Sequence, residues 1–420
     1  MSSESAKPNQ SNFDDVRMRG FRSRTKVDDA LSWIDEVTSS LGHESVPLVD
    51  SAGRILAQDV TSECNVPNFR RAMMDGFALH AADTLGATNY NPLLLEIIGS
   101  VLPGQSFDGE IKRGQAVSIM TGAPIPNGAD AVLPAEKVSR DADSLTVLDE
   151  VSPAKHVGRV GEDITTGTKV LSRGRCLRPQ DLGILSSIGK EQVPVVRKPR
   201  VRLLITGDEL CVAGSKPKPN QTVDANSPML RALVERDGGV LQFDGITEDQ
   251  PEAIRSLMQD DSFDVVIVSG GSSVGQEDHA PRILSEVGEL AIHGVAMRPS
   301  SPAGMGRVGD RLVFLLPGNP VSCLCAYDFF AGRGIRRLGA RSSDWPYRKQ
   351  TVTLSRKISS VVGRQDYARV RMVGNEAEPI AIAGASVLSS TTRADGFVIV
   401  PTDSEGYPAG AEVQLFLFDQ

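Results

Sequence analysis

Two continuous apolar runs, each followed by a glycine-rich turn, stand out in the hydrophobic pattern of the chain. They cover residues 263–268 and 312–316. Strands that are apolar at every position are typical of a parallel sheet covered by helices on both faces. Because parallel strands end at the same edge of a sheet, we expect the two turns to lie side by side where α/β folds bind their ligands.

Around these runs the chain alternates between short apolar strands and helical periodicity. Ser227 and Pro228 are placed to begin one helix as N-cap and first helical residue, and residues 247–250 have capping-box spacing before another. This pattern predicts a doubly wound, three-layer α/β domain. In chain order the expected elements are 201–205, a helix over 228–234, 240–243, a helix around 254–257, 263–268, 281–287, 312–316 and a helix from 321.

The rest of the chain follows other periodicities. Apolar residues fall at helical spacing over 26–41, short β-rich segments follow over 60–150, and a further helix begins near Arg178 and ends before Gly189. After residue 345, short alternating runs predict a small all-β barrel or sandwich. We therefore expect an α/β multidomain protein with a central doubly wound domain. Its predicted parts are a disordered tail (1–20), a discontinuous linker and helical domain (21–60 plus 150–195), a β-rich domain (61–149), the α/β domain (196–340) and a C-terminal β-barrel (341–420).

Composition narrows the class of protein. The 420 residues are 40% hydrophobic and 23% charged, with a net charge of −8 and a pI near 5.3. This balance predicts a globular protein and argues against a nucleic-acid surface, which would show a basic patch. The five cysteines lack zinc or disulfide spacing, no apolar run reaches about 18 residues, and the polar start does not resemble a signal peptide. The sequence therefore predicts a cytoplasmic protein without a membrane span.

The predicted turns carry candidate binding chemistry. Glycines such as Gly270 and Gly318 let several backbone N–H groups point at one anion. Arg298 lies between the two turns in the sequence and Asp278 follows the first turn. Asp208 and Glu209 follow the first strand of the domain, at the same edge as the turns. Carboxylates placed there suit Mg²⁺, which favours one or two carboxylates plus phosphate oxygens. Packing without a ligand is the alternative for either turn taken alone.

Three polar-glycine clusters lie nearer the N-terminus, at residues 74–78, 120–124 and 160–164. Each one taken singly is a turn in which Asp or Thr bonds the local backbone. Together with three motifs of the α/β region, in this order, they resemble the molybdopterin molybdenumtransferase family, which includes the E domain of gephyrin. The resemblance spans roughly residues 22–418. Its motifs are Met74-Asp-Gly-Phe-Ala78, Met120-Thr-Gly-Ala123, Gly161-Glu-Asp-Ile164, Thr206-Gly-Asp-Glu-Leu210, Ser269-Gly-Gly-Ser-Ser-Val-Gly275 and Leu316-Pro-Gly-Asn-Pro-Val-Ser322.

The resemblance implies an activity and an assembly. The expected reaction is insertion of molybdate into adenylylated molybdopterin, with Mg²⁺ or another divalent cation, which hydrolyses the adenylate and releases AMP and molybdenum cofactor. The resemblance also implies an elongated homodimer of four-domain subunits, in which the third domain binds molybdopterin and the site includes parts of the partner subunit. Molybdopterin adenylyltransferase is the expected donor of the substrate.

Site residues follow from the resemblance position by position. The expected catalytic residues are Asp75, Thr121, Asp163, Glu209, Asp278 and Arg298, with Glu209 and Asp278 as metal ligands. The expected cofactor-binding residues are Gly270, Gly271, Ser273, Gly275, Pro317, Gly318, Asn319, Ser322, Arg369 and Ser386.

One loop departs from the family pattern. Where the family usually has Lys-Pro-Gly-Lys-Pro, this chain has Arg298 at the first lysine and Ser301 at the second. Arginine keeps one cation there as a planar fork, and the second cation is lost. Arg70 or Arg71 is a candidate to supply the missing charge. The loss motivates an alternative function, a non-catalytic molybdopterin-binding carrier or scaffold; a pyrophosphatase acting on another nucleotide is a third reading, based on the α/β domain alone.

Overall fold

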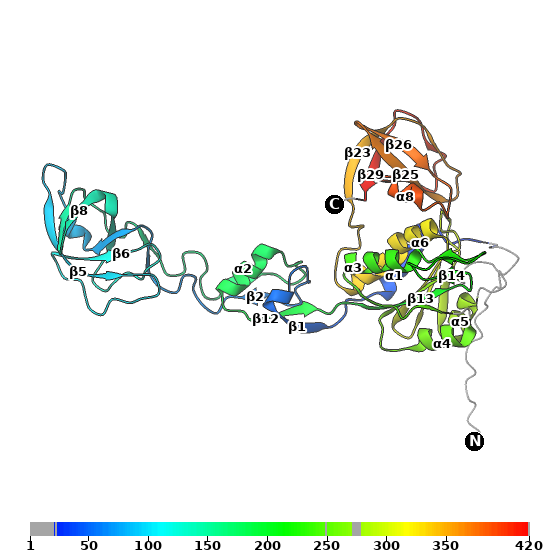
Figure 1. The fold of residues 1–420 in the computed structure, drawn as a ribbon, viewed down its shortest axis with the longest axis horizontal. Coiled ribbons are helices and arrows are strands. Elements are labelled where there is room, and N and C mark those ends of the chain that lie inside the picture. Colours follow the sequence, from blue (N-terminus) through cyan, green and yellow to red (C-terminus); the bar gives the residue numbers. More distant parts are fainter. Residues whose placement is uncertain (1–20, 22, 248–249, 271–278, 419–420) are drawn as a thin grey trace, which may run out of the picture. The chain divides into compact units, whose positions relative to one another are not determined.

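The computed structural model describes residues 21, 23–247, 250–270 and 279–418. They divide into two compact units: the described residues of 21–44 and 195–418 form the first, and residues 45–194 form the second (Figure 1). The tail over 1–20, predicted to be disordered, lies outside the described residues. The domain boundaries given above stay predictions.

A seven-stranded sheet forms the centre of the first unit, with strand order β16-β13-β18-β22-β21-β19 and β17 paired to β13. The strands from β16 to β22 run parallel, as the continuous apolar runs predicted. Two antiparallel strands at one edge, β21 and β19, were not predicted, because β21 contains two glycines and β19 is only partly buried. The bounds are β13 (Arg200–Thr206), β16 (Val240–Gln242), β17 (Ile246–Thr247), β18 (Val265–Ser269), β19 (Glu289–His293), β21 (Gly304–Val308) and β22 (Arg311–Leu316).

Helices cover both faces of this sheet, which confirms the three-layer prediction (Figure 1). Alternate residues of one strand face opposite cores: in β18, Val265 and Ile267 pack with α1, α3 and α6, whereas Val266 and Val268 pack with α4 and α5. Apolar residues at every strand position are needed because both cores must be filled. The helices are α1 (Val27–Val37), α3 (Asn226–Arg236), α4 (Pro251–Gln259), α5 (Ala280–Val287), α6 (Pro320–Ala326), a π-helix (Tyr327–Ala331) and α7 (Gly332–Leu338).

Three predicted helix ends were wrong. Helix α1 stops at Val37, earlier than the predicted residue 41, because Thr38 adopts an extended conformation (φ −110°, ψ 116°). The N-cap prediction at Ser227 was wrong because the helix begins at Asn226, and the Asp224 carboxylate accepts the N–H groups of Asn226 (2.8 Å) and Ser227 (3.2 Å). The capping box over 247–250 was wrong because α4 begins at Pro251, a favoured first helical residue.

The two glycine turns lie side by side, as predicted. Strands β18 and β22 pair in parallel with Ser269 opposite Leu316, so their turns leave the sheet together. A Cβ atom added to Gly318 would lie 3.7 Å from the Gly270 Cα. Gly270 has φ +100°, and a Cβ there would lie 2.3 Å from the Thr206 carbonyl oxygen. Only glycine fits this close approach.

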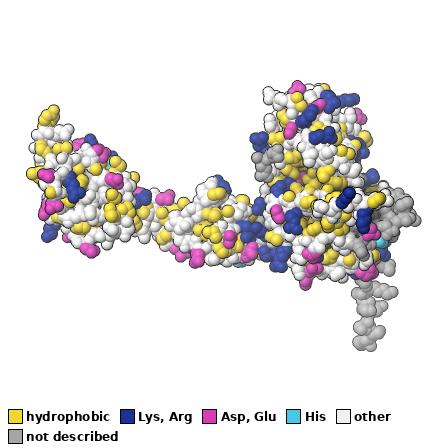
Figure 2. Space-filling model, in the orientation of Figure 1, with side chains coloured by type: hydrophobic (Ala, Val, Ile, Leu, Met, Phe, Trp, Pro, Cys, Tyr) yellow, Lys and Arg dark blue, Asp and Glu magenta, His cyan; other side chains and the backbone are white. Residues whose placement is uncertain are grey.

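The C-terminal segment forms a closed five-stranded β-barrel, as predicted, in the order β25-β26-β23-β29-β27 with β27 pairing back to β25. A sixth strand, β20 (Met297–Arg298), comes from the α/β region and pairs in parallel with β25. Apolar side chains from the barrel and from the helices form one core, and Figure 2 shows hydrophobic side chains gathered where the two meet. The bounds are β23 (Arg348–Leu354), β25 (Gln365–Val373), β26 (Glu376–Ala381), α8 (Ser389–Thr392), β27 (Gly396–Val400) and β29 (Glu412–Leu417).

The second unit contains a six-stranded sheet with order β7-β4-β6-β5-β9-β8. It also contains α2 (Pro179–Ser187), followed by Gly189 at φ +77°, as predicted. No helix in the described ranges is long and apolar enough to cross a membrane. The sheet strands are β4 (Gly76–Leu79), β5 (Leu93–Val101), β6 (Gln115–Ile119), β7 (Ala131–Pro134), β8 (Val138–Asp141) and β9 (Ser144–Val147). Short strand pairs associated with this unit are β1 (His43–Pro47) with β12 (Gln192–Val196), β2 (Val60–Thr61) with β11 (Lys169–Leu171) and β3 (Arg71–Ala72) with β10 (Val157–Gly158). The first unit contains two further short pairs, β14 (Leu210–Cys211) with β15 (Thr222–Val223) and β24 (Ile358–Ser359) with β28 (Gly406–Tyr407).

Candidate functional site

Two cavities open at the carboxyl edge of the seven-stranded sheet, and both are lined by Gly318 and Asn319. We call them the arginine cavity and the glutamate cavity. The arginine cavity, of about 760 Å³, is lined by residues 23–24, 296–302, 317–319, 322, 362–364 and 383–385. The glutamate cavity, of about 730 Å³, is lined by residues 205–207, 209–210, 222–226, 269–270, 318–320, 386 and 388.

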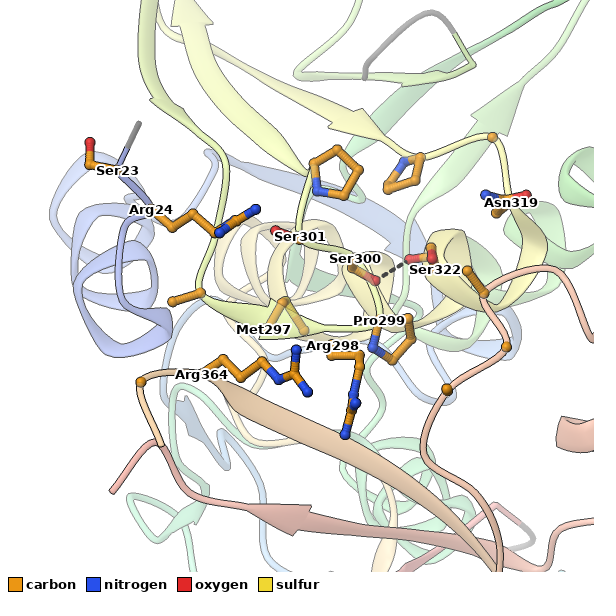
Figure 3. A pocket seen from close by; sticks show the side chains of 18 of the residues that line it. Ser23, Arg24, Met297, Arg298, Pro299, Ser300, Ser301, Asn319, Ser322 and Arg364 are labelled. Atoms are coloured by element: carbon orange, nitrogen blue, oxygen red, sulfur yellow. Dashed lines mark hydrogen bonds between the residues drawn. The ribbon is translucent and has the colours of Figure 1, made fainter. Parts of the chain in front are cut away.

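Three arginines from distant parts of the chain line the arginine cavity (Figure 3). Arg298 comes from β20, Arg364 from the turn before β25, and Arg24 from the segment before α1. The fully buried Asp366 carboxylate forms ion pairs with the Arg298 guanidinium and with Arg364 Nε at 3.3 Å, and it accepts a hydrogen bond from Ser360 Oγ at 2.7 Å. One buried carboxylate thus holds two of the three guanidinium groups.

The loop that follows Arg298 is fixed by an unusual backbone conformation. Ser300 has φ +83°, a region that favours glycine, and its side chain is buried. Its hydroxyl donates to the Ser322 carbonyl oxygen at 2.6 Å (Figure 3). This bond joins the loop to the first turn of α6 and stabilises the left-handed conformation.

Backbone contacts also fix the segment that carries Arg24. Thr25 N donates to Gly294 O at 3.0 Å, and Ala296 N donates to Thr25 O at 2.8 Å. The Arg24 guanidinium lies over the Phe21 ring, with its central carbon 5.8 Å from the ring centroid. In Figure 3 the Arg24 side chain points into the cavity, towards Ser301.

Neutral groups hold the glutamate cavity together. Asn226 Nδ2 donates to Ser269 Oγ (3.0 Å) and to Gly318 O (2.8 Å), and this amide therefore bridges the two glycine turns. Within the described part of the chain, Asn226 Oδ1 and Thr206 Oγ1 are buried without a hydrogen-bond partner. Glu209 extends this oxygen-rich lining from the turn after β13. Buried acceptors left unfilled suit a ligand that brings donors or a cation.

The donor set of the glutamate cavity fits a hard divalent cation. Its lining contains the carboxylates of Glu209 and Asp224 and the Asn226 amide oxygen, and oxygen ligands are those that Mg²⁺ prefers. Among the described residues no group of three or more His, Cys, Asp or Glu is placed to hold a metal ion. A cation here would therefore need ligand atoms from a bound phosphate as well.

The predicted site residues of the α/β region and the barrel divide between the two cavities. Arg298, Pro317 and Ser322 line the arginine cavity, and Glu209, Gly270 and Ser386 line the glutamate cavity, while Gly318 and Asn319 line both. Gly271, Ser273, Gly275 and Asp278 lie outside the described residues.

Arg369 lines neither cavity. Its side chain is fully buried in β25, donates to the Ala383 carbonyl oxygen, and has a pKa lowered by burial. This hydrogen bond holds the loop 383–385, which lines the arginine cavity. The arginine near β25 that itself lines the cavity is Arg364.

In the second unit the structure brings Asp75 and Thr121 together. Thr121 N and Thr121 Oγ1 each donate to Asp75 Oδ1 at 2.7 Å. The hydroxyl, and then the backbone N–H, lower the pKa of the Asp75 carboxyl. Asp163 is exposed in the turn beside Glu162, and Glu162 forms an ion pair with Arg71 at 2.7 Å.

Four residues of the cavities were missed by reasoning from the sequence, namely Arg24, Arg364, Asp224 and Asn226. For Asn226 a signal was available, since it begins a helix directly at the predicted ligand edge. Asp224 also carried the right spacing to cap that helix. Nothing local marked Arg24 or Arg364, which reach the cavity only through long-range strand pairing.

Comparisons with known proteins cover nearly the whole chain. Three family models match it: "MoeA N-terminal region (domain I and II)" over residues 25–189, "Probable molybdopterin binding domain" over 202–336, and "MoeA C-terminal region (domain IV)" over 351–418. The chain is 30% identical to the molybdopterin molybdenumtransferase of Bacillus subtilis over 94% of each chain. It is 31% identical to molybdopterin molybdenumtransferase 2 of Mycobacterium tuberculosis, over 89% of this chain and 94% of that one.

A solved structure gives the same picture. The crystal structure of a molybdopterin biosynthesis MoeA protein from Pyrococcus horikoshii has a TM-score of 0.81 and 33% sequence identity. The match covers 95% of this chain and 100% of that one.

Proposed function

The chain belongs to the MoeA family of molybdenum cofactor biosynthesis proteins, and we propose that it is a molybdopterin molybdenumtransferase. In the proposed reaction it inserts molybdate into adenylylated molybdopterin and hydrolyses the adenylate to give molybdenum cofactor and AMP. The observation that carries this proposal is the sharing of Gly318 and Asn319 by a cationic cavity and an oxygen-lined cavity. Two substrates of different chemistry can then meet across one short backbone segment.

The arginine cavity is the proposed site for molybdate. Arg298 and Arg364 both line the cavity, and their ion pairs with Asp366 restrict their motion; in Figure 3 the Arg298 side chain extends towards β25. Guanidinium groups bind oxyanions through paired, charge-assisted hydrogen bonds. The buried carboxylate therefore positions the cations before the anion arrives.

The glutamate cavity is the proposed site for the pterin phosphate and the adenylate. Glycine turns bring backbone N–H groups close to a phosphate, and Asn226 fixes the two turns relative to each other. Glu209, with Asp278 as the second expected ligand, would hold Mg²⁺; Asp278 lies outside the described residues. Bound there, the cation would neutralise charge on the phosphoanhydride.

Residues of the chain itself account for the remaining requirements. Cleaving a phosphoanhydride needs a positioned oxygen nucleophile and charge neutralisation more than a covalent protein intermediate. The segment of Gly318 and Asn319 lines both cavities. In the proposed reaction this segment keeps the oxyanion and the adenylate at a fixed separation. No nucleophilic side chain is needed for this role.

The assembly is part of the same proposal. We expect a homodimer in which Asp75, Thr121 and Asp163 of one subunit complete the site of the other, with molybdopterin adenylyltransferase as substrate donor and the cytoplasm as location. The hydrogen bonds that orient Asp75 towards Thr121 support a prepared carboxylate on this unit.

AMP release from adenylylated molybdopterin by the purified full chain tests the function. With Mg²⁺ and molybdate we expect release, and omission of molybdate or chelation of the metal should suppress it. Binding of the adenylate without any AMP release would overturn the proposal and favour the carrier or scaffold. Hydrolysis of nucleotides that lack the pterin would favour the pyrophosphatase.

A further inference from the structure

We propose that Arg24 supplies the second net positive charge of the arginine cavity and makes this cavity selective for tetrahedral dianions over monoanions. The inference rests on the proposed function, in which the cavity receives molybdate, a doubly charged oxyanion. It assigns a binding role to a residue that precedes the first helix and lies outside every motif of the resemblance.

The charges around the cavity lead to this inference. Arg298 and Arg364 carry two positive charges, and the buried Asp366 that pairs with both carries one negative charge. These three residues leave a net charge of +1. Adding Arg24, the third arginine of the lining, gives +2, which matches a dianion.

The surroundings of Arg24 leave its charge available. Among the described residues it forms no ion pair with a carboxylate, and its side chain lies over the Phe21 ring. A ring face supports a guanidinium without neutralising it. The Thr25 bonds to Gly294 and Ala296 hold the backbone beside the cavity wall, so the exposed Arg24 side chain extends from a fixed point at this wall.

The position of Arg24 also corresponds to the charge that the loop lacks. Its side chain points towards Ser301 (Figure 3), which stands where the family pattern has its second lysine. Arg71, one of the two residues considered from the sequence, is paired with Glu162 at 2.7 Å. Because Arg24 lines the cavity itself, the structure offers a substitute cation from the N-terminal segment, outside every motif of the resemblance.

Titration calorimetry with sodium molybdate tests this role on the full chain, without pterin or nucleotide. We expect Arg24→Gln to weaken molybdate binding about tenfold, because one cation near a dianion is lost. Lys26→Gln is the matched control: it removes an exposed positive charge two residues away that does not line the cavity. This control should change affinity by less than about twofold, since isolated surface charges contribute little.

Two further measurements separate charge from shape. Perchlorate, a tetrahedral monoanion, should lose less than about threefold in affinity in Arg24→Gln, measured by competition with molybdate. Adding Ser301→Lys to Arg24→Gln should restore molybdate affinity, because the lysine returns a cation to the same side of the cavity. Equal losses for both anions, or failure of the double variant to recover, would overturn the inference.

The outcome is independent of turnover. If Arg24→Gln binds molybdate as tightly as wild type, the role of Arg24 is disproved while AMP release can still support the transferase. If molybdate binding depends on Arg24 but wild type releases no AMP, the proposed function fails and the charge assignment stands. Absence of molybdate binding to wild type would overturn the inference.

Discussion

The arginine cavity and the glutamate cavity share a wall, but they differ in charge. Arginines line the first, whereas carboxylates and neutral oxygen atoms line the second. In the arginine cavity the counter-charge is part of the protein, because buried Asp366 pairs with two of the three arginines. In the glutamate cavity the counter-charge is missing, since Glu209 and the unfilled oxygens of Asn226 and Thr206 have no described cation beside them. The first cavity is prepared for one kind of ligand. The second is completed only when a ligand brings donors or a metal ion.

This contrast predicts that the glutamate cavity is the more sensitive to loss of charge in an activity assay. Glu209→Gln should lower the rate of AMP release by at least about 100-fold, because the carboxylate that would hold the metal becomes neutral. Asp208→Asn is the matched control, since Asp208 is the adjacent acid but does not line this cavity. Comparable losses in both variants would mean that the cavity does not distinguish the two acids.

The arginine cavity should instead be sensitive in a stability assay. Asp366→Ala leaves two guanidinium groups without their buried partner, and we expect the free energy of unfolding to fall by about 3 kcal/mol. Urea unfolding followed by circular dichroism measures it. Glu378, which also pairs with two arginines (Arg356 and Arg371) but near the surface, provides the control. Glu378→Ala should hardly move the unfolding midpoint; a large shift there would remove the distinction between buried and exposed networks.

A smaller change in stability should separate two features of Ser300 in the same cavity, its hydrogen bond to Ser322 O and its left-handed backbone. Ser300→Ala loses the hydrogen bond to Ser322 O and keeps the left-handed backbone, whereas Ser300→Gly loses the bond but relaxes the backbone. We expect the glycine variant to be more stable than the alanine variant by about 1 kcal/mol. Thermal unfolding of both variants checks the difference. Equal stabilities would mean that the backbone at φ +83° carries no strain.

The smallest effect that we predict is a change in the pKa of the Asp75 carboxyl. Neutral donors, rather than arginines, hold this carboxylate. Because its pKa is lowered from the usual 3.8 in the folded state, the stability it contributes is present above that value and is lost as pH falls through the folded pKa. Thr121→Val removes the hydroxyl donor, so the pKa should rise towards its usual value. Carboxyl titration by NMR detects this; an unchanged pKa would assign the shift to the backbone N–H alone.

Continuous apolar strands made the central fold predictable. The continuous apolar run over 265–268 is typical of a strand in a doubly covered parallel sheet, and the parallel register then placed Gly270 beside Gly318. The edge strands β19 and β21 were not predicted, because their hydrophobic residues show no clear periodicity. The predicted start of α3 was wrong because the Asp224 carboxylate, rather than the Ser227 hydroxyl, caps this helix.

The candidate site was predictable only where it lies on the sheet edge. Glu209 and the glycine turns follow predicted strands, and local sequence sufficed to place them together. Arg24 and Arg364 are brought to the cavity by two remote pairings, Thr25 with Val295 and β20 with β25. Such pairings depend on tertiary packing, which no local pattern records.

The two-residue strand β20 has a consequence for how this architecture can change over time. Arg298 is encoded in the α/β region, yet its backbone belongs to the sheet of the barrel. Its ion-pair partner Asp366 lies on the neighbouring strand β25. A gene exchange that replaced the C-terminal region alone would bring in a foreign partner for Arg298 and leave Arg24 behind. The proposed anion site can therefore be inherited only as a set drawn from three separate segments of the chain.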